Sequence, residues 1–200
     1  MSEDLNKSIK KNAIPLGLVL GVIVTVVSIL SFYVMTSTTS IILISAAPVL
    51  LSVIIPIALA VIYSKQLRTK IGGFWNFRQA TSGIFIMLLI SFAVQFLVRD
   101  MLFAKVIEPD MVPKMEASMT TAITQMLEKS NASQEAIDKQ VDDIQKKFDE
   151  QKAPTIGKQV QAVFITIIFL FVLSLILAAF LKKEGHTFST DAELESDPTV

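Results

Sequence analysis

Side chains able to do chemistry are few in this sequence, and the clearest spacing among them belongs to methionines. Met111, Met115 and Met119 recur every four residues, which on a helix places their thioethers on one face. Cu(I) is a soft ion that accepts such sulfur ligands. A plainer interpretation, in which methionine fills an adaptable apolar stripe, is favoured because the chain has no cysteine and its one histidine, His186, lies far along the sequence. We therefore expect no metal site.

Other motifs for catalysis or binding are equally weak. The sequence offers no paired carboxylates, no nucleophile beside a base and no phosphate-binding loop, so we expect no catalytic residue, no cofactor and no enzyme. Asn131-Ala132-Ser133 matches the glycosylation sequon, which matters only in a eukaryotic secretory pathway. The net charge is zero and basic residues cluster only beside apolar stretches, so nucleic acid is not an expected partner.

Membrane-spanning helices are the elements that must position these residues. Apolar residues make up 52% of the chain and charged residues 18%, and residues 12–64 carry no charge at all. One helix of that length would far exceed the hydrocarbon core of about 30 Å, so the run must fold back at its polar break, residues 36–40. The sequence therefore predicts an all-α integral membrane four-helix bundle. Its expected spans are residues 14–35, 41–63, 79–98 and 159–181.

Positive charge beside the spans predicts their orientation. Short cytoplasmic loops are enriched in lysine and arginine, and loop 64–78 is basic whereas loop 36–40 carries no charge. Loop 64–78 and both termini, residues 1–13 and 182–200, are therefore expected in the cytoplasm of a multi-pass protein of the cell membrane. The tail is polar and acidic, which predicts disorder. A cleaved signal peptide is disfavoured because the first apolar run is too long and lacks a cleavage site.

Aromatic and basic residues are mixed just before the third span. They are Lys65, Arg68, Lys70, Phe74, Trp75, Phe77 and Arg78. Amphipathic rings beside cations are typical of the interface between lipid headgroups and hydrocarbon, so we expect this segment to anchor the protein in the bilayer. A specific site for an anionic lipid is the less favoured alternative.

Small residues in the first span predict close helix packing. Gly17 and Gly21 form a G-x-x-x-G motif, extended by Thr25 and Ser28 on nearly the same face. Packing against another span of the same chain is favoured over dimerisation. Prolines 48 and 56 predict a kink in the second span. The predicted spans contain no ionisable residue, which argues against a proton-coupled transporter.

The long loop, residues 99–158, is predicted to be a helical hairpin outside the cytoplasm, with helices at residues 114–129 and 134–151. Ser133 is the expected N-cap of the second helix, and Pro154 and Gly157 are expected to end it. Large apolar residues recur at helical spacing: Met115, Met119, Ile123 and Met126, then Ile137, Val141, Ile144 and Phe148. A lone two-helix hairpin is marginal. We therefore expect residues 113–151 to bury further apolar surface against a second protomer, a partner protein or the outer leaflet.

Three segments carry a resemblance to a known family. They are Gly73-Phe74-Trp75-Asn76-Phe77-Arg78-Gln79-Ala80 at the third span, Val106-Ile107-Glu108-Pro109 after it, and Lys182-Lys183 after the last span. With the four-span layout, they resemble a family of bacterial inner-membrane proteins catalogued as domain of unknown function 4199, found mainly in Bacteroidota. The resemblance implies a bacterial inner membrane and a periplasmic loop, which would make the sequon incidental. It implies no activity and no site residue.

These observations favour a non-enzymatic interaction or structural component of the cell envelope that presents a periplasmic helical hairpin. Its expected partners are the lipid bilayer and, through residues 113–151, a second copy or an envelope protein. The alternative is a subunit of an oligomeric transporter or channel. Only thin polar stripes, such as Thr25 with Ser28 and Ser91 with Gln95, run along the spans to support a pore.

Overall fold

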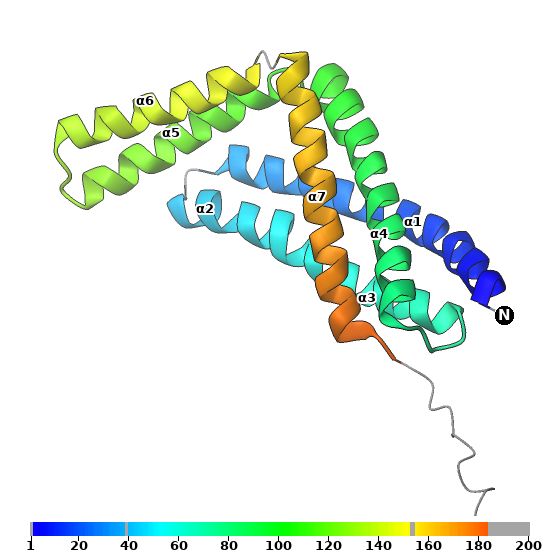
Figure 1. Cartoon of the computed structure of the whole chain (residues 1–200). Coiled ribbons are helices and arrows are strands. Elements are labelled where there is room, and N and C mark those ends of the chain that lie inside the picture. The colour runs from blue at the N-terminus through cyan, green and yellow to red at the C-terminus, as the bar shows by residue number, and fades with distance from the viewer. Residues whose placement is uncertain (1, 39, 153–154, 184–200) are drawn as a thin grey trace, which may run out of the picture.

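The computed structural model describes residues 2–38, 40–152 and 155–183, and it confirms the all-α fold class. Figure 1 shows the order of the helices along the chain. Their bounds are α1 Ser2–Ser37, α2 Ile41–Val49, the π-helical segment η1 Leu50–Ile54, α3 Ile55–Lys70, α4 Phe77–Gln95, the π-helical segment η2 Phe96–Ile107, α5 Met111–Lys129, α6 Gln134–Lys152 and α7 Ile156–Leu181.

Four of the helical rods are long and apolar enough to cross a membrane: Asp4–Thr36, Ile42–Lys70, Phe77–Ile107 and Ile156–Leu181. This confirms the four candidate spans, but every helix runs beyond the predicted uncharged stretch. Hydropathy marks only the lipid-facing part of a helix, whereas backbone hydrogen bonds continue into its polar flanks. The predicted N-terminal segment is accordingly part of α1, and its Ile9 side chain is buried.

Both ends of the hairpin loop also differ from the expected boundaries. Gly157 does not end the second hairpin helix, because it lies in the first turn of α7. Pro154 and the tail from Glu184 onward lie outside the described residues. In the second span, the hydrogen-bond ladder changes to π geometry between Pro48 and Pro56, where the two missing proline N–H groups interrupt the α pattern.

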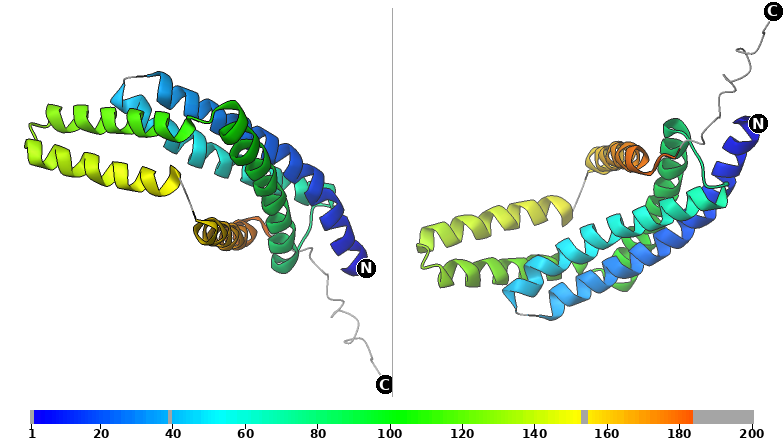
Figure 2. Two further views of the ribbon diagram at one scale, coloured as in Figure 1. Left: turned by 90° about the horizontal axis from the view of Figure 1, so that it is seen from above. Right: turned by 90° about the horizontal axis from the view of Figure 1, so that it is seen from below.

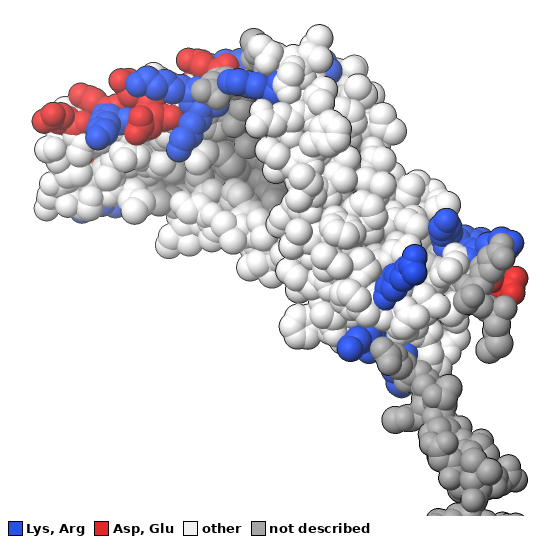
Figure 3. Space-filling model, viewed as in Figure 1, with Lys and Arg blue, Asp and Glu red and all other residues white. Residues whose placement is uncertain are grey.

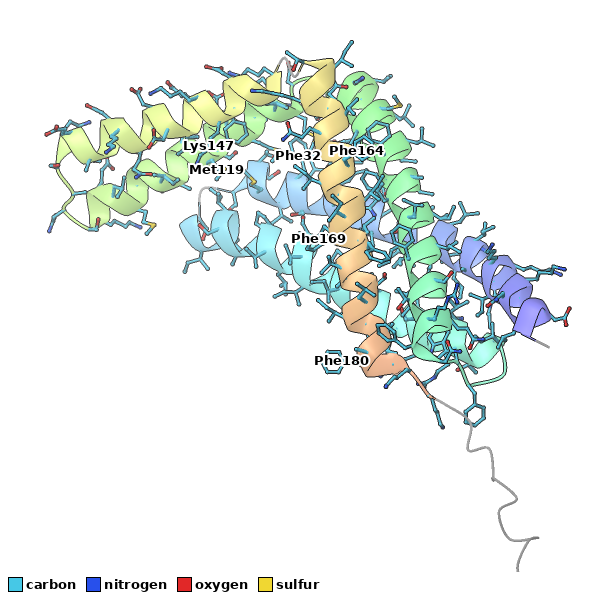
Figure 4. The ribbon with its side chains drawn as sticks, in the orientation of Figure 1. Phe32, Met119, Lys147, Phe164, Phe169 and Phe180 are labelled. Atoms are coloured by element: carbon cyan, nitrogen blue, oxygen red, sulfur yellow. The ribbon has the colours of Figure 1, made fainter. Side chains whose placement is uncertain are left out.

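The spans meet in a core built mainly by α1 and α4. Leu20 of α1 and Ile84 and Met87 of α4 are almost completely buried there. Helix α7 runs antiparallel to α4 and stands apart from α2, as Figures 1 and 2 show. Large apolar side chains of α7 are consequently exposed, and Phe180, labelled in Figure 4, is 82% exposed. Such a surface is expected of a helix that faces lipid.

On the face shown in Figure 3, the charged side chains gather towards two ends of the molecule, with an uncharged belt between them. At one end, called here the lysine-rich end, lie the start of α1, the α3–α4 loop and the end of α7. At the other, called here the hairpin end, α5 and α6 extend sideways from the spans (Figure 1). The belt between the two ends is the surface that a bilayer would cover.

Candidate functional site

The hairpin end is held to the spans by an aromatic cluster at its base. Phe32 and Tyr33 of α1 pack edge to face with Phe103 of η2, with ring centroids 5.9 and 6.0 Å away from that of Phe103. Phe103 is 4% exposed, so η2 is locked against the end of α1 just before the hairpin begins. Edge-to-face aromatic pairs add specific geometry to apolar burial.

A second apolar contact fixes α5 to the ends of α1 and α2. Ala122 of α5 is buried with Met35 of α1 and Ile44 of α2, and Met115 packs against this cluster. Helix α5 packs against both α2 and α6 and lies between them in Figure 1. The hairpin therefore buries additional apolar surface against the spans of its own chain. This contact was not among the three that the sequence led us to expect.

A pocket of about 420 Å³ opens beside these contacts. It is lined by Phe32, Tyr33, Thr36, Ser37, Glu108, Lys114, Ala117 and Ser118. Lys114 Nζ donates a hydrogen bond to the Glu108 carboxylate, and this bond, with the negative charge of the same group, raises the pKa of Lys114 above its ordinary value. The pair ties the first turn of α5 to the end of η2. Since the two opposite charges satisfy each other, we assign the pair a structural role.

The predicted apolar stripe of α6 is largely buried in the hairpin. Ile137, Ile144 and Phe148 are each 6% exposed, and Val141 is half-buried. The Ser133 hydroxyl accepts a hydrogen bond from the Ala136 backbone N–H, which makes Ser133 the N-cap of α6, as predicted.

An ion pair closes the hairpin near its base. Lys152 Nζ of α6 lies 2.7 Å from Glu116 Oε2 of α5 and 2.9 Å from Asp149 Oδ1. Hydrogen bonds to Asp149 and then to Glu116 raise the pKa of Lys152. This contact joins α6 to α5 and was not predicted from the sequence.

The methionines of α5 do not act as one group. Met115 is packed beneath the hairpin, whereas Met119 and Met126 are 38% and 57% exposed, and Ile123 is half-buried. Figure 4 shows Met119 and Phe32 in the region where the hairpin meets α1. The packing interpretation of these methionines accounts for Met115, and the exposed pair leaves an apolar edge on the hairpin.

Gly17 and Gly21 lie at a close approach between α1 and α4. A Cβ atom at Gly17 would be 2.6 Å from the Met87 carbonyl oxygen, and one at Gly21 would be 2.7 Å from Val94 Cβ. Thr25 is buried and its hydroxyl donates to the Gly21 carbonyl of the same helix, whereas Ser28 is half-buried. The contact made by this motif is therefore within the chain.

At the lysine-rich end, Trp75 differs from the interfacial anchor that was expected. Its side chain is 2% exposed, and its indole N–H donates to the Leu181 carbonyl at 2.9 Å. Arg68 donates to the same carbonyl at 3.1 Å. The backbone of Trp75 also pairs with that of Lys183. Trp75 turns inward because the end of α7 supplies an acceptor that its N–H would otherwise have to find in lipid headgroups.

The remaining interfacial candidates keep an exposed position. Phe74 and Phe77 are 49% and 40% exposed, and Lys183 Nζ lies 5.2 Å above the Phe74 ring. Lys65, Lys70 and Arg78 are also exposed, and Arg68 is half-buried. Their role at a membrane interface stays a prediction. No sequence pattern indicated that α7 ends on Trp75, since the two partners are more than a hundred residues apart.

Comparison with known proteins identifies a family for this chain. Residues 15–183 match the family described as Protein of unknown function (DUF4199). No curated protein and no solved structure matches the chain. The matched range begins in the first span and ends just after the last one, so it includes the hairpin and both of its contacts with the spans. Because it covers far more than half of the sequence, the chain belongs to the DUF4199 family.

Proposed function

We propose that the protein is a non-enzymatic structural or interaction component of the cell envelope, and that its α5–α6 hairpin is the surface it presents. One observation carries this proposal. Helix α5 is joined to α1 and α2 through Ala122 and Met115, which leaves α6 on the outer side. Along that side α6 exposes charged residues: Asp138, Lys139, Asp142, Asp143, Lys146 and Lys147.

A rigid, charged helix face suits recognition of another protein better than chemistry. The ion pairs Glu108–Lys114 and Lys152–Glu116 hold the base of the hairpin, so a partner would meet a preformed surface and little ordering entropy would oppose binding. The basic loop between α3 and α4 supports a cytoplasmic lysine-rich end and thus a periplasmic hairpin. A second copy or another envelope protein is the proposed partner.

Site-specific photocrosslinking in native membranes tests the proposal. A photoreactive residue at Lys147, which is exposed on α6 (Figure 4), should give a discrete adduct whose mass identifies a second copy or a different protein. The same residue at the buried Ile144 serves as the matched control and should react only within the chain. If none of the exposed α6 positions gives an adduct above the control, the proposal is wrong.

The alternative of a transporter or channel subunit makes a different prediction. The polar side chains inside the spans are largely bonded to their own helices, as for Thr25 with Gly21 and Gln95 with Ser91. A pore would have to form between chains. Ion or solute flux through vesicles containing the purified protein, above that of empty vesicles, would favour this alternative.

A further inference from the structure

A groove of about 390 Å³ lies between the start of α4 and the last turns of α7. Its lining is Phe77, Arg78, Thr81, Ser82, Phe85, Phe171 and Leu175. It is separate from the hairpin, because α4 begins and α7 ends at the lysine-rich end (Figure 1). The groove therefore opens where the uncharged belt meets the cationic end of the molecule.

The two ends of the groove differ in chemistry. Arg78 stands at the outer end, exposed, and none of the described residues forms an ion pair or a hydrogen bond with its guanidinium. Phe85 lies seven residues further along α4, roughly 10 Å deeper at the rise of an α-helix. There Phe85 meets Phe171 edge to face, with centroids 5.5 Å apart, and Leu175 continues the apolar wall.

We propose that this groove binds one anionic phospholipid, with the phosphate on Arg78 and an acyl chain along Phe85, Phe171 and Leu175. Arginine offers several N–H donors in a fork that matches phosphate oxygens. Ser82 is exposed in the same lining, and its hydroxyl can add a further donor. Lys182 and Lys183, which follow the last residue of α7, add positive potential at this end of the molecule.

The groove changes from a cation at its outer end to aromatic side chains at its inner end, and this order favours a phospholipid over other ligands. A free phosphate would leave the apolar wall formed by Phe85 and Phe171 uncovered. A span from a second copy would have to cover Arg78 with apolar side chains, which is unfavourable for an unpaired charge. A phospholipid satisfies both ends at once, because its charged headgroup and its chain have the same order as the groove.

Native mass spectrometry of the full-length protein in detergent micelles tests this site. We would titrate phosphatidylglycerol and phosphatidylcholine with identical acyl chains. The expected result is one phosphatidylglycerol bound per chain, and Arg78→Gln should weaken that binding about tenfold, the factor that a hydrogen bond to a charged group typically supplies. Lys70→Gln is the matched control, because Lys70 is an exposed cation of the same end outside the groove, and it should change binding less than about twofold.

A steric variant separates the groove from its charge. Ser82→Trp should fill the groove and weaken binding of both lipids while Arg78 stays in place. Melting of each variant without added lipid shows whether the fold is retained, and Arg78→Gln alters an exposed side chain and should retain it. Equal loss in Arg78→Gln and Lys70→Gln would show diffuse attraction and overturn the proposal. Equal binding of the two lipids to the unmodified protein, or normal binding to folded Ser82→Trp, would also overturn it.

Discussion

The closest contact between two spans gives the sharpest test of the fold. Replacing Gly17 with alanine adds one Cβ atom, and that atom would lie 2.6 Å from the Met87 carbonyl oxygen and 2.8 Å from Ile90 Cβ. Optimal contacts between carbon atoms are about 3.5–4.0 Å long. Both neighbours belong to α4 close to its backbone, so a side-chain rotation cannot relieve the clash. Helix α1 must move away from α4 by part of an ångström or more.

The free energy of this shift can be bracketed. Forcing additional carbon into a packed core typically costs about 1–3 kcal/mol. Alanine also gains about 0.8–1.0 kcal/mol over glycine through helix propensity, which partly hides the cost. Gly157→Ala corrects for part of that gain, because Gly157 lies in the first turn of α7 and, among the described residues, no neighbouring atom lies within 4 Å of an added Cβ. We expect Gly17→Ala to be less stable than Gly157→Ala by about 1–3 kcal/mol.

Two further glycines extend the series. Gly21→Ala should behave like Gly17→Ala, since its added Cβ would lie 2.7 Å from Val94 Cβ. The double variant should cost less than the sum, because one displacement of α1 relieves both contacts. Gly83→Ala should cost less, because the atoms nearest to its added Cβ, Ile9 Cγ2 at 2.8 Å and Leu67 Cδ2 at 3.2 Å, belong to side chains and not to a backbone.

The measurement is reversible unfolding of the full-length protein in mixed micelles, with helicity followed as the fraction of denaturing detergent rises. Each variant gives a free energy of unfolding relative to the unmodified protein. If Gly17→Ala and Gly157→Ala are equally stable, then α1 and α4 do not approach closely in the membrane protein. The packing role of the G-x-x-x-G motif would then be wrong.

Three other predictions address the two ends. Trp75→Phe removes the indole donor to Leu181 and should lower the unfolding free energy by about 1 kcal/mol or more in the same assay; unchanged stability would contradict the contact. Lys114 has a raised pKa because of Glu108, so its stabilising charge is present below the ordinary pKa of 10.5 and is lost as pH rises through the raised value. Proteolysis of the hairpin should increase as the pH rises through that value. The increase should be smaller in Lys114→Met, which has already lost the Glu108 pair but keeps the pairs of Lys152, whose pKa is also raised. Reporter fusions after Lys70 should be active in the cytoplasm and those after Asn131 outside it; a cytoplasmic signal at Asn131 would reverse the proposed topology.

The local features of this fold could be predicted from sequence. The uncharged stretches indicate four spans, because the thickness of the bilayer sets how long such a stretch must be. The hairpin could be predicted from the helical spacing of its apolar residues and from the N-cap at Ser133. Each of these signals is contained within a few turns of one helix. Helix ends were less predictable, since α1 continues through charged residues to Ser2.

Contacts between distant segments could not be predicted in the same way. A tryptophan beside cations has the same sequence pattern whether its ring meets headgroups or, like Trp75, the end of another helix. The apolar stripe of α5 indicated that something must cover it, but not that Met35 and Ile44 would do so. Arg78 was recognised as an interfacial cation, whereas the groove beside it requires α7, which no local pattern places there.

The junction at Leu181 has a consequence for the order in which the protein is made. Leu181 is synthesised 106 residues after Trp75 and 113 residues after Arg68, yet its carbonyl is the acceptor for both. A nascent chain that has inserted only three spans therefore lacks the acceptor that the Trp75 indole and the Arg68 guanidinium share. Once the last span is inserted, the Leu181 carbonyl can accept both hydrogen bonds and join α7 to α3 and to the α3–α4 loop. The junction can therefore form only in a chain whose last span is in place.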